Sequence, residues 1–154
     1  MSSNVWIESI LRDIPTFLGV YSSDDIPPPI FSRSSCILNF SGKNDIGTHF
    51  VVVLYNRYFC TYYDPLNLDF IPETIKNYMQ LYYSDNVRYV KIKIQHTLSN
   101  FCGLYCMFVC ILHYMGKPIY TTLNKIFPSP KLSNDEKLVK LLCKTLRKIY
   151  TNKK

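Results

Sequence analysis

The sequence lacks the features that would divide it or place it in a membrane. It has no internal repeat, no low-complexity block and no Gly/Ser-rich linker, and its longest apolar run, from Leu104 to Met115, has 12 residues. Because a bilayer-spanning helix needs about 20 apolar residues, we interpret this run as a buried core helix and expect no membrane association. At 154 residues, the chain has the size of a single domain, which we expect over residues 1–154.

Glycine and charged residues are also scarce. The chain has 5 glycines and 19% charged residues, against 47% hydrophobic residues with 13 Tyr and 9 Phe. This composition excludes collagen-like and disordered chains, and it argues against a disulfide-rich miniprotein. No basic stretch followed by an apolar one opens the sequence, so we expect an intracellular, reducing compartment and free thiols at all six cysteines.

The middle of the chain is rich in β-branched and aromatic residues. Three such segments, 36–40, 48–55 and 58–63, are predicted to be strands. Only Asn56 and Arg57 separate the last two, which predicts an antiparallel hairpin with a two-residue loop.

Helical patterns lie on both sides of these strands. We predict helices over residues 4–13, from Pro72 onward, from just after Cys102 and over about 134–150, with a further strand over 90–94. Strands and helices grouped in this way predict an α+β fold, in which a central, mostly antiparallel sheet packs against the buried helix that begins just after Cys102.

Cys102 is placed where a nucleophile would be useful. It lies at the start of the buried helix, where free N–H groups and the helix dipole favour a thiolate, and Gly103 allows close approach of the chain. The alternative is that Cys102, Cys106 and Cys110 form a small apolar stripe in the core, an interpretation that we accept for Cys106 and Cys110.

A metal site is the second interpretation of the cysteines. Together with His113 they lie near one helical face, but a spacing of four along one helix does not surround a tetrahedral ion. We therefore expect no metal.

A nucleophilic thiol needs a base and a group that orients this base. Among the three histidines, His113 is expected in the core or at a helix end and His96 in a loop, whereas His49 interrupts an apolar strand. Asp64 closes the partner strand, so a hairpin would bring it to His49. From the residues alone, a turn role for Asp64 and a structural role for His49 remain open.

Four segments resemble one family. These are Gly47-Thr-His49-Phe, Tyr63-Asp64-Pro65, Gln95 followed seven residues later by Cys102-Gly-Leu-Tyr-Cys106, and Phe17-Leu-Gly-Val-Tyr21. Their residues and order resemble the adenovirus-type cysteine protease (adenain) family, which is distantly similar to the SUMO-deconjugating proteases.

The resemblance covers most of residues 10–115 and implies an adenain-like fold with a defined site. It implies Cys102 as nucleophile, His49 as general base and later acid, Asp64 as the group that orients His49, and Gln95 as an oxyanion donor together with the Cys102 backbone N–H. It further implies a peptidase that processes viral precursor proteins at glycine-type sites during virion maturation, in the virion and the host nucleus.

Two positions depart from the family. Adenoviral enzymes are activated by a viral peptide through a disulfide upstream of the glutamine, but no cysteine lies between Cys60 and Cys102, and Ser84 stands at the corresponding position. We therefore do not expect disulfide-linked activation, although DNA and a peptide remain candidate activators. Phe50 replaces a common tryptophan. No metal or organic cofactor is implied.

Positive charge is concentrated at one end of the chain. The net charge is +7, and the segment from residue 131 onward contains eight basic residues and two acidic ones. On the last predicted helix, basic side chains form a stripe opposite the apolar face, so DNA binding and a merely solvated face are equal alternatives. The candidate DNA-binding residues are Lys140, Lys144, Arg147 and Lys148.

Two rival functions remain open at this point. One is a deconjugating protease that acts after the Gly-Gly tail of a ubiquitin-like protein. The other is a non-catalytic basic protein that binds nucleic acid or a capsid component on the same fold. In each case we expect a monomer.

Overall fold

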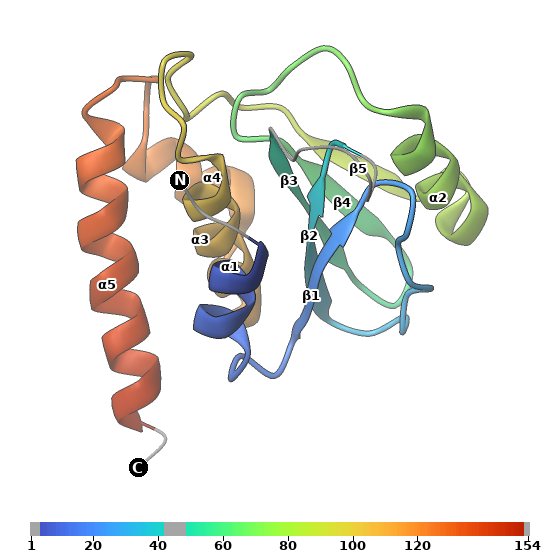
Figure 1. Ribbon diagram of the computed structural model, residues 1–154, viewed down its shortest axis with the longest axis horizontal. Coiled ribbons are helices and arrows are strands. Elements are labelled where there is room, and N and C mark those ends of the chain that lie inside the picture. Colours follow the sequence, from blue (N-terminus) through green and yellow to red (C-terminus); the bar gives the residue numbers. More distant parts are fainter. Residues whose placement is uncertain (1–3, 42–48, 153–154) are drawn as a thin grey trace.

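The structure is a computed structural model that describes residues 4–41 and 49–152. Within these residues, a five-stranded sheet is covered by helices on both faces (Figure 1). The strands are β1 (Phe17–Ser22), β2 (Ser34–Asn39), β3 (Phe50–Tyr55), β4 (Cys60–Tyr63) and β5 (Val87–Val90). The helices are α1 (Asn4–Leu11), α2 (Glu73–Tyr83), α3 (Cys102–Tyr114), α4 (Ile119–Ile126) and α5 (Asn134–Asn152). The predicted α+β class is confirmed.

The sheet is mixed, with strand order β1-β2-β3-β4-β5. The two inner pairings, β2–β3 and β3–β4, are antiparallel, whereas the two outer pairings are parallel. The prediction of a mostly antiparallel sheet is therefore wrong at both edges. The reason lies in the connections, because the long segment that contains α2 returns the chain to run β5 parallel to β4, as parallel pairs require.

The sheet separates two apolar cores. In Figure 1, α1, α3, α4 and α5 lie on one side of the sheet and α2 lies on the other. All six residues of β3 are buried and alternate between the two cores. Those facing α3 are Phe50, Val52 and Leu54, and those facing α2 are Val51, Val53 and Tyr55. A strand covered on both faces needs no polar residue, which explains its continuous apolar sequence.

The β3–β4 hairpin is antiparallel as predicted, but its loop is longer. Tyr55 pairs with Cys60, and the loop closes with a 2.9 Å hydrogen bond from the Asn56 N–H to the Phe59 carbonyl. Two-residue hairpin loops favour glycine, which needs no extra energy to adopt a positive φ, and this loop has none. The predicted two-residue loop is therefore wrong.

The predicted strand over 90–94 also differs from the structure, since β5 ends at Val90. The next residues leave the sheet because the neighbouring strand β4 is followed by Pro65. Proline has no backbone N–H and cannot continue the pairing. Instead, the N–H groups of Ile94 and Gln95 both donate to the Pro65 carbonyl at 3.1 Å. This change of partner directs the chain toward the start of α3.

The terminal helices pack on the α3 side of the sheet. In α5, Leu138 and Leu142 are buried as the predicted apolar face requires. In α1, Ile7 and Leu11 are buried, whereas Trp6 is exposed. None of the helices in residues 4–41 and 49–152 is long and apolar enough to cross a bilayer.

Candidate active site

His49 and Asp64 form a buried pair at the end of the sheet where β3 begins and β4 ends. His49 directly precedes β3 and Asp64 directly follows β4, and the antiparallel register brings the two positions together. The His49 Nε2 atom lies 2.7 Å from Asp64 Oδ1. Their side chains are 9% and 3% exposed, so solvent screens this interaction little.

A tight turn holds the Asp64 carboxylate in place. Its Oδ1 also accepts a hydrogen bond from the Leu66 N–H at 2.9 Å, and its Oδ2 accepts one from the Leu68 N–H at 3.1 Å. The Asp64 carbonyl accepts a further bond from the Asn67 N–H at 2.8 Å. The turn role and the histidine-partner role of Asp64 therefore coexist, because one oxygen serves both.

Cys102 approaches His49 from the helical layer. It is the first residue of α3, and its thiol is close enough to the His49 side chain to be among the groups that raise the pKa of His49. Since Asp64 occupies Nε2, the nitrogen left for the sulfur is Nδ1. One turn further along α3, the Cys106 Sγ lies 3.4 Å from the carbonyl oxygen of Phe50, the neighbour of His49. This contact is one of those between α3 and β3.

The electrostatic surroundings favour a protonated His49. Burial lowers the pKa of His49, but its hydrogen bond with Asp64 and the electrostatic influence of Asp64 and Cys102 outweigh burial and raise the pKa to about 9. The imidazole is therefore protonated at neutral pH. A protonated imidazole next to a thiol can donate a proton in thiol-based acyl transfer.

This raised pKa predicts a pH-dependent stability. A protonated group whose pKa is higher in the folded state stabilises the fold below its unfolded pKa of about 6.5, and the contribution is lost as pH rises through about 9. Between these values we expect the free energy of unfolding of the wild type to fall relative to that of His49→Gln by up to about 3 kcal/mol. Denaturant titrations at several pH values measure it, and parallel pH profiles would contradict it.

Gln95 is buried in the segment between β5 and α3, and its hydrogen bonds go to Pro65 and Ser99 rather than to His49 or Cys102. It is 1% exposed, and its Nε2 donates to the Ser99 carbonyl at 3.0 Å. Within the part of the chain that the structure describes, its buried Oε1 has no hydrogen-bond partner. An amide nitrogen carries two hydrogens, so one N–H of Gln95 remains for another acceptor.

The other histidines and cysteines take structural positions. The His113 Nε2 lies 3.1 Å from the Tyr55 carbonyl oxygen, and burial lowers the pKa of His113. The Nδ1 of His96 accepts the Leu98 N–H in the loop before α3. All six cysteines are free, and Cys143 is the exposed one. Among the residues that the structure describes, no group of three or more His, Cys, Asp or Glu side chains is arranged to hold a metal ion.

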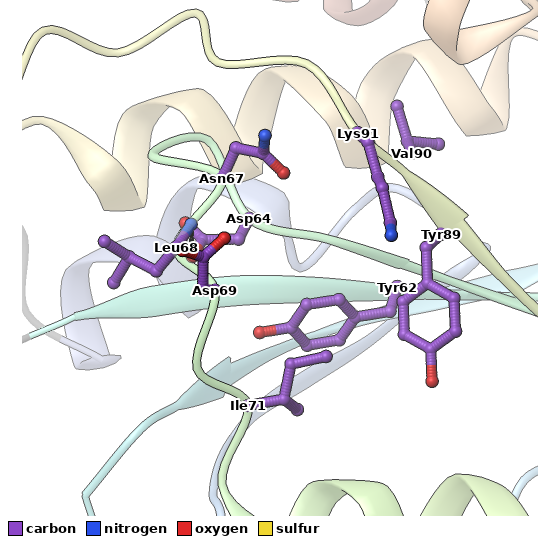
Figure 2. Close-up of a pocket in the computed structure, with 9 residues that line it drawn as sticks. All are labelled: Tyr62, Asp64, Asn67, Leu68, Asp69, Ile71, Tyr89, Val90 and Lys91. Carbon is purple, nitrogen blue, oxygen red and sulfur yellow. Dashed lines mark hydrogen bonds between the residues drawn. The ribbon is translucent and has the colours of Figure 1, made fainter.

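A pocket of about 280 Å³ lies next to the Asp64 turn (Figure 2). Tyr62 and Tyr89 line one part of it, and Figure 2 shows the Lys91 side chain pointing toward these two rings. His49, Gln95 and Cys102 are not among its lining residues. The pocket therefore adjoins the Asp64 carboxylate rather than the Cys102 sulfur.

The remaining predicted positions lie outside this cluster. Gly47 and Thr48 lie outside the described residues, and Ser84 is exposed at the end of α2. The four candidate DNA-binding residues are exposed on α5, and Lys140 pairs with Glu136 at 3.2 Å. The sequence interpretation missed Asn134 and Asp135, which contact the loop before α3. Their role is set by tertiary contacts, so no local pattern signals it.

Comparison with known proteins adds no relative to this picture. No protein-family model matches the chain, and a search of curated proteins finds no significant match.

Proposed function

We propose that this protein is a cysteine endopeptidase that cleaves viral precursor proteins of the capsid or core at glycine-type sites during virion maturation. The observation that carries the peptidase proposal is that His49 hydrogen-bonds the Asp64 carboxylate and is also influenced electrostatically by the Cys102 thiol. This order of groups is what thiol-based acyl transfer requires. The viral substrate and the glycine preference rest on the family resemblance alone.

The proposed reaction uses each group in turn. The Cys102 thiolate attacks the peptide carbonyl carbon, and His49 donates its proton to the leaving amine, which gives a thioester and a new amino terminus. His49, now neutral, takes a proton from water, which attacks the thioester and releases the carboxylate product and the thiol. Asp64 keeps the ring oriented through Nε2 during both steps.

Negative charge develops on the carbonyl oxygen in both steps. The Cys102 backbone N–H lies in the first turn of α3, where N–H groups have no partner within the helix. We assign this N–H and the remaining Gln95 N–H as the oxyanion donors. Each preorganised donor of this kind is typically worth about 2.7–4 kcal/mol in the transition state.

The proposal is tested with purified protein, a glycine-terminal thiol-directed probe and a panel of glycine-rich peptides, with and without DNA. We expect labelling of Cys102 and peptide hydrolysis. Co-expression with precursor proteins from the same genome, followed by mapping of new termini, then identifies the substrate. Cleavage only after the Gly-Gly tail of a ubiquitin-like protein would favour deconjugation. Neither labelling nor hydrolysis would favour a non-catalytic binding protein.

We also propose that the basic face of α5 binds DNA. Lys144 and Lys148 line a groove of about 550 Å³ between α5 and the end of α3, and Arg147 is exposed on the same helix. Each phosphate contact releases counterions, so binding weakens as salt rises.

Replacing Lys140, Lys144, Arg147 and Lys148 together by alanine is expected to reduce the salt dependence of DNA binding. If all four contact phosphates, the slope of log K against log salt falls by roughly 3–4, measured by fluorescence anisotropy with a DNA duplex. A control variant that removes four other exposed cations, Arg57, Lys76, Lys117 and Lys125, has the same net charge. Equal slopes in both variants would refute the assignment to α5.

A further inference from the structure

The segment that connects β5 to α3 carries Gln95 and leads directly to Cys102. It has no place in the sheet, and Thr97, Leu98 and Asn100 are exposed along it. On one side it is held by the Pro65 carbonyl, which accepts the N–H groups of Ile94 and Gln95. Two bonds at its beginning do not fix its remaining residues.

The start of α5 holds the same segment on the other side. Asn134 is buried, and its Nδ2 donates to the Ile94 carbonyl at 2.9 Å and to the Ser129 carbonyl at 2.7 Å. The next residue, Asp135, accepts the Ser99 hydroxyl on Oδ1 at 2.9 Å. The first two residues of α5 therefore contact both ends of the segment.

We call these contacts of Asn134 and Asp135 with the segment the clamp. Ser99 connects the clamp to both candidate oxyanion donors. Its carbonyl accepts the Gln95 Nε2–H at 3.0 Å, and its Oγ accepts the Phe101 N–H at 3.1 Å, immediately before Cys102. The Asp135 Oδ1 also accepts the Tyr105 hydroxyl at 2.8 Å, which ties the first turn of α3 to the same oxygen. One carboxylate oxygen thus joins the Gln95 loop and the Cys102 helix.

We propose that Asp135, assisted by Asn134, is a positioning residue that holds Gln95 and the start of α3 in the geometry needed to stabilise the oxyanion. The inference rests on the proposed peptidase function for its catalytic consequence. Because substrate binding is not involved, loss of the clamp affects kcat more than KM. A displacement of about 1 Å at a catalytic donor lowers the rate by up to about 100-fold.

Hydrogen exchange tests the clamp without reference to catalysis. In Asp135→Ala and Ser99→Ala, we expect faster amide exchange over residues 95–101 with unchanged exchange in β3 and β4. Tyr105→Phe is the matched control for Ser99→Ala, because it removes the other hydroxyl from the same Asp135 oxygen but leaves the segment held. Asp135→Asn keeps an acceptor oxygen, so we expect exchange slower than in Asp135→Ala and close to that of the wild type. Glu136→Gln removes a neighbouring negative charge and controls for the change in charge. Unchanged exchange in Asp135→Ala would overturn the clamp.

Kinetics then test the catalytic consequence. We expect kcat for peptide hydrolysis to fall about 10- to 100-fold in Asp135→Ala, with KM within about twofold. Alkylation of Cys102 by iodoacetamide needs no oxyanion donor, so its rate stays near that of the wild type. In a Gln95→Ala background, Asp135→Ala adds less loss than it causes alone.

The two proposals fail in different ways. If the wild type hydrolyses no peptide, the peptidase function is contradicted. In that case the hydrogen-exchange result alone decides whether the clamp exists. A wild type that hydrolyses peptides with the same kcat as Asp135→Ala contradicts the positioning role.

Discussion

Replacing Cys102 by alanine is expected to abolish peptide hydrolysis and to leave the fold intact. In the proposed mechanism the Cys102 thiol forms the acyl intermediate, and loss of a nucleophile in such arrangements lowers kcat by about 10⁶. Alanine fills nearly the same space at the first position of α3 without removing a backbone contact. Hydrolysis of glycine-rich peptides and the thermal unfolding midpoint measure the two effects.

Cys106→Ala is the matched control, one turn along the same helix. Cys106 is fully buried in the core, and burial raises its thiol pKa well above the ordinary value, so it is not expected to react. Its replacement is expected to destabilise the fold by about 1 kcal/mol and to keep most of the activity. Iodoacetamide mapping by mass spectrometry distinguishes Cys102 from the exposed Cys143. Undiminished hydrolysis in Cys102→Ala would disprove the assignment of the nucleophile.

Asp64→Asn is expected to lower kcat by about 10³- to 10⁴-fold. The amide removes the negative charge that stabilises protonated His49, and it can present an N–H where the ring also has one. The pKa of His49 therefore falls from about 9, because the hydrogen bond and charge of Asp64 are among the causes that raise it. The asparagine oxygen still accepts a backbone N–H of the turn, so we expect the hairpin to persist.

Asp69→Asn is the control on the same loop. Asp69 lines the pocket beside Asp64 and is exposed, and no hydrogen bond to His49 is recorded for it (Figure 2). It should change kcat by less than about twofold. NMR titration of the His49 ring reports the pKa in both variants. Equal kcat values for Asp64→Asn and Asp69→Asn would contradict the orienting role of Asp64.

Strong local patterns were sufficient for most of the fold. The aromatic and β-branched segments identified β2, β3 and β4, and the apolar run after Cys102 identified α3. Two elements were missed. β1 contains Gly19 at φ 145° beside an irregular register, which interrupts its strand pattern. α4 has only eight residues, of which Leu123 alone is buried, so its apolar face is short. Both are stabilised by packing against other elements.

The candidate site shows the same division. The chemistry of His49, Asp64 and Cys102 and their order along the chain suggested a base, an orienting group and a nucleophile. Whether they meet depended on the hairpin register and on the packing of α3 against β3. Neither can be derived from spacing, because a one-residue change in register would turn the side chains to the opposite face.

By itself, the sequence determined the class of fold and the buried helix that begins at Cys102. It also identified the side chains whose chemistry suits a nucleophile, a base and an orienting group. Only the tertiary structure decided that the outer strands run parallel, that the chain leaves the sheet at Pro65, and that Asp135 reaches Ser99. The physical reason is that periodicity and residue chemistry act over one element. Strand direction and long-range hydrogen bonds depend on how the elements pack together.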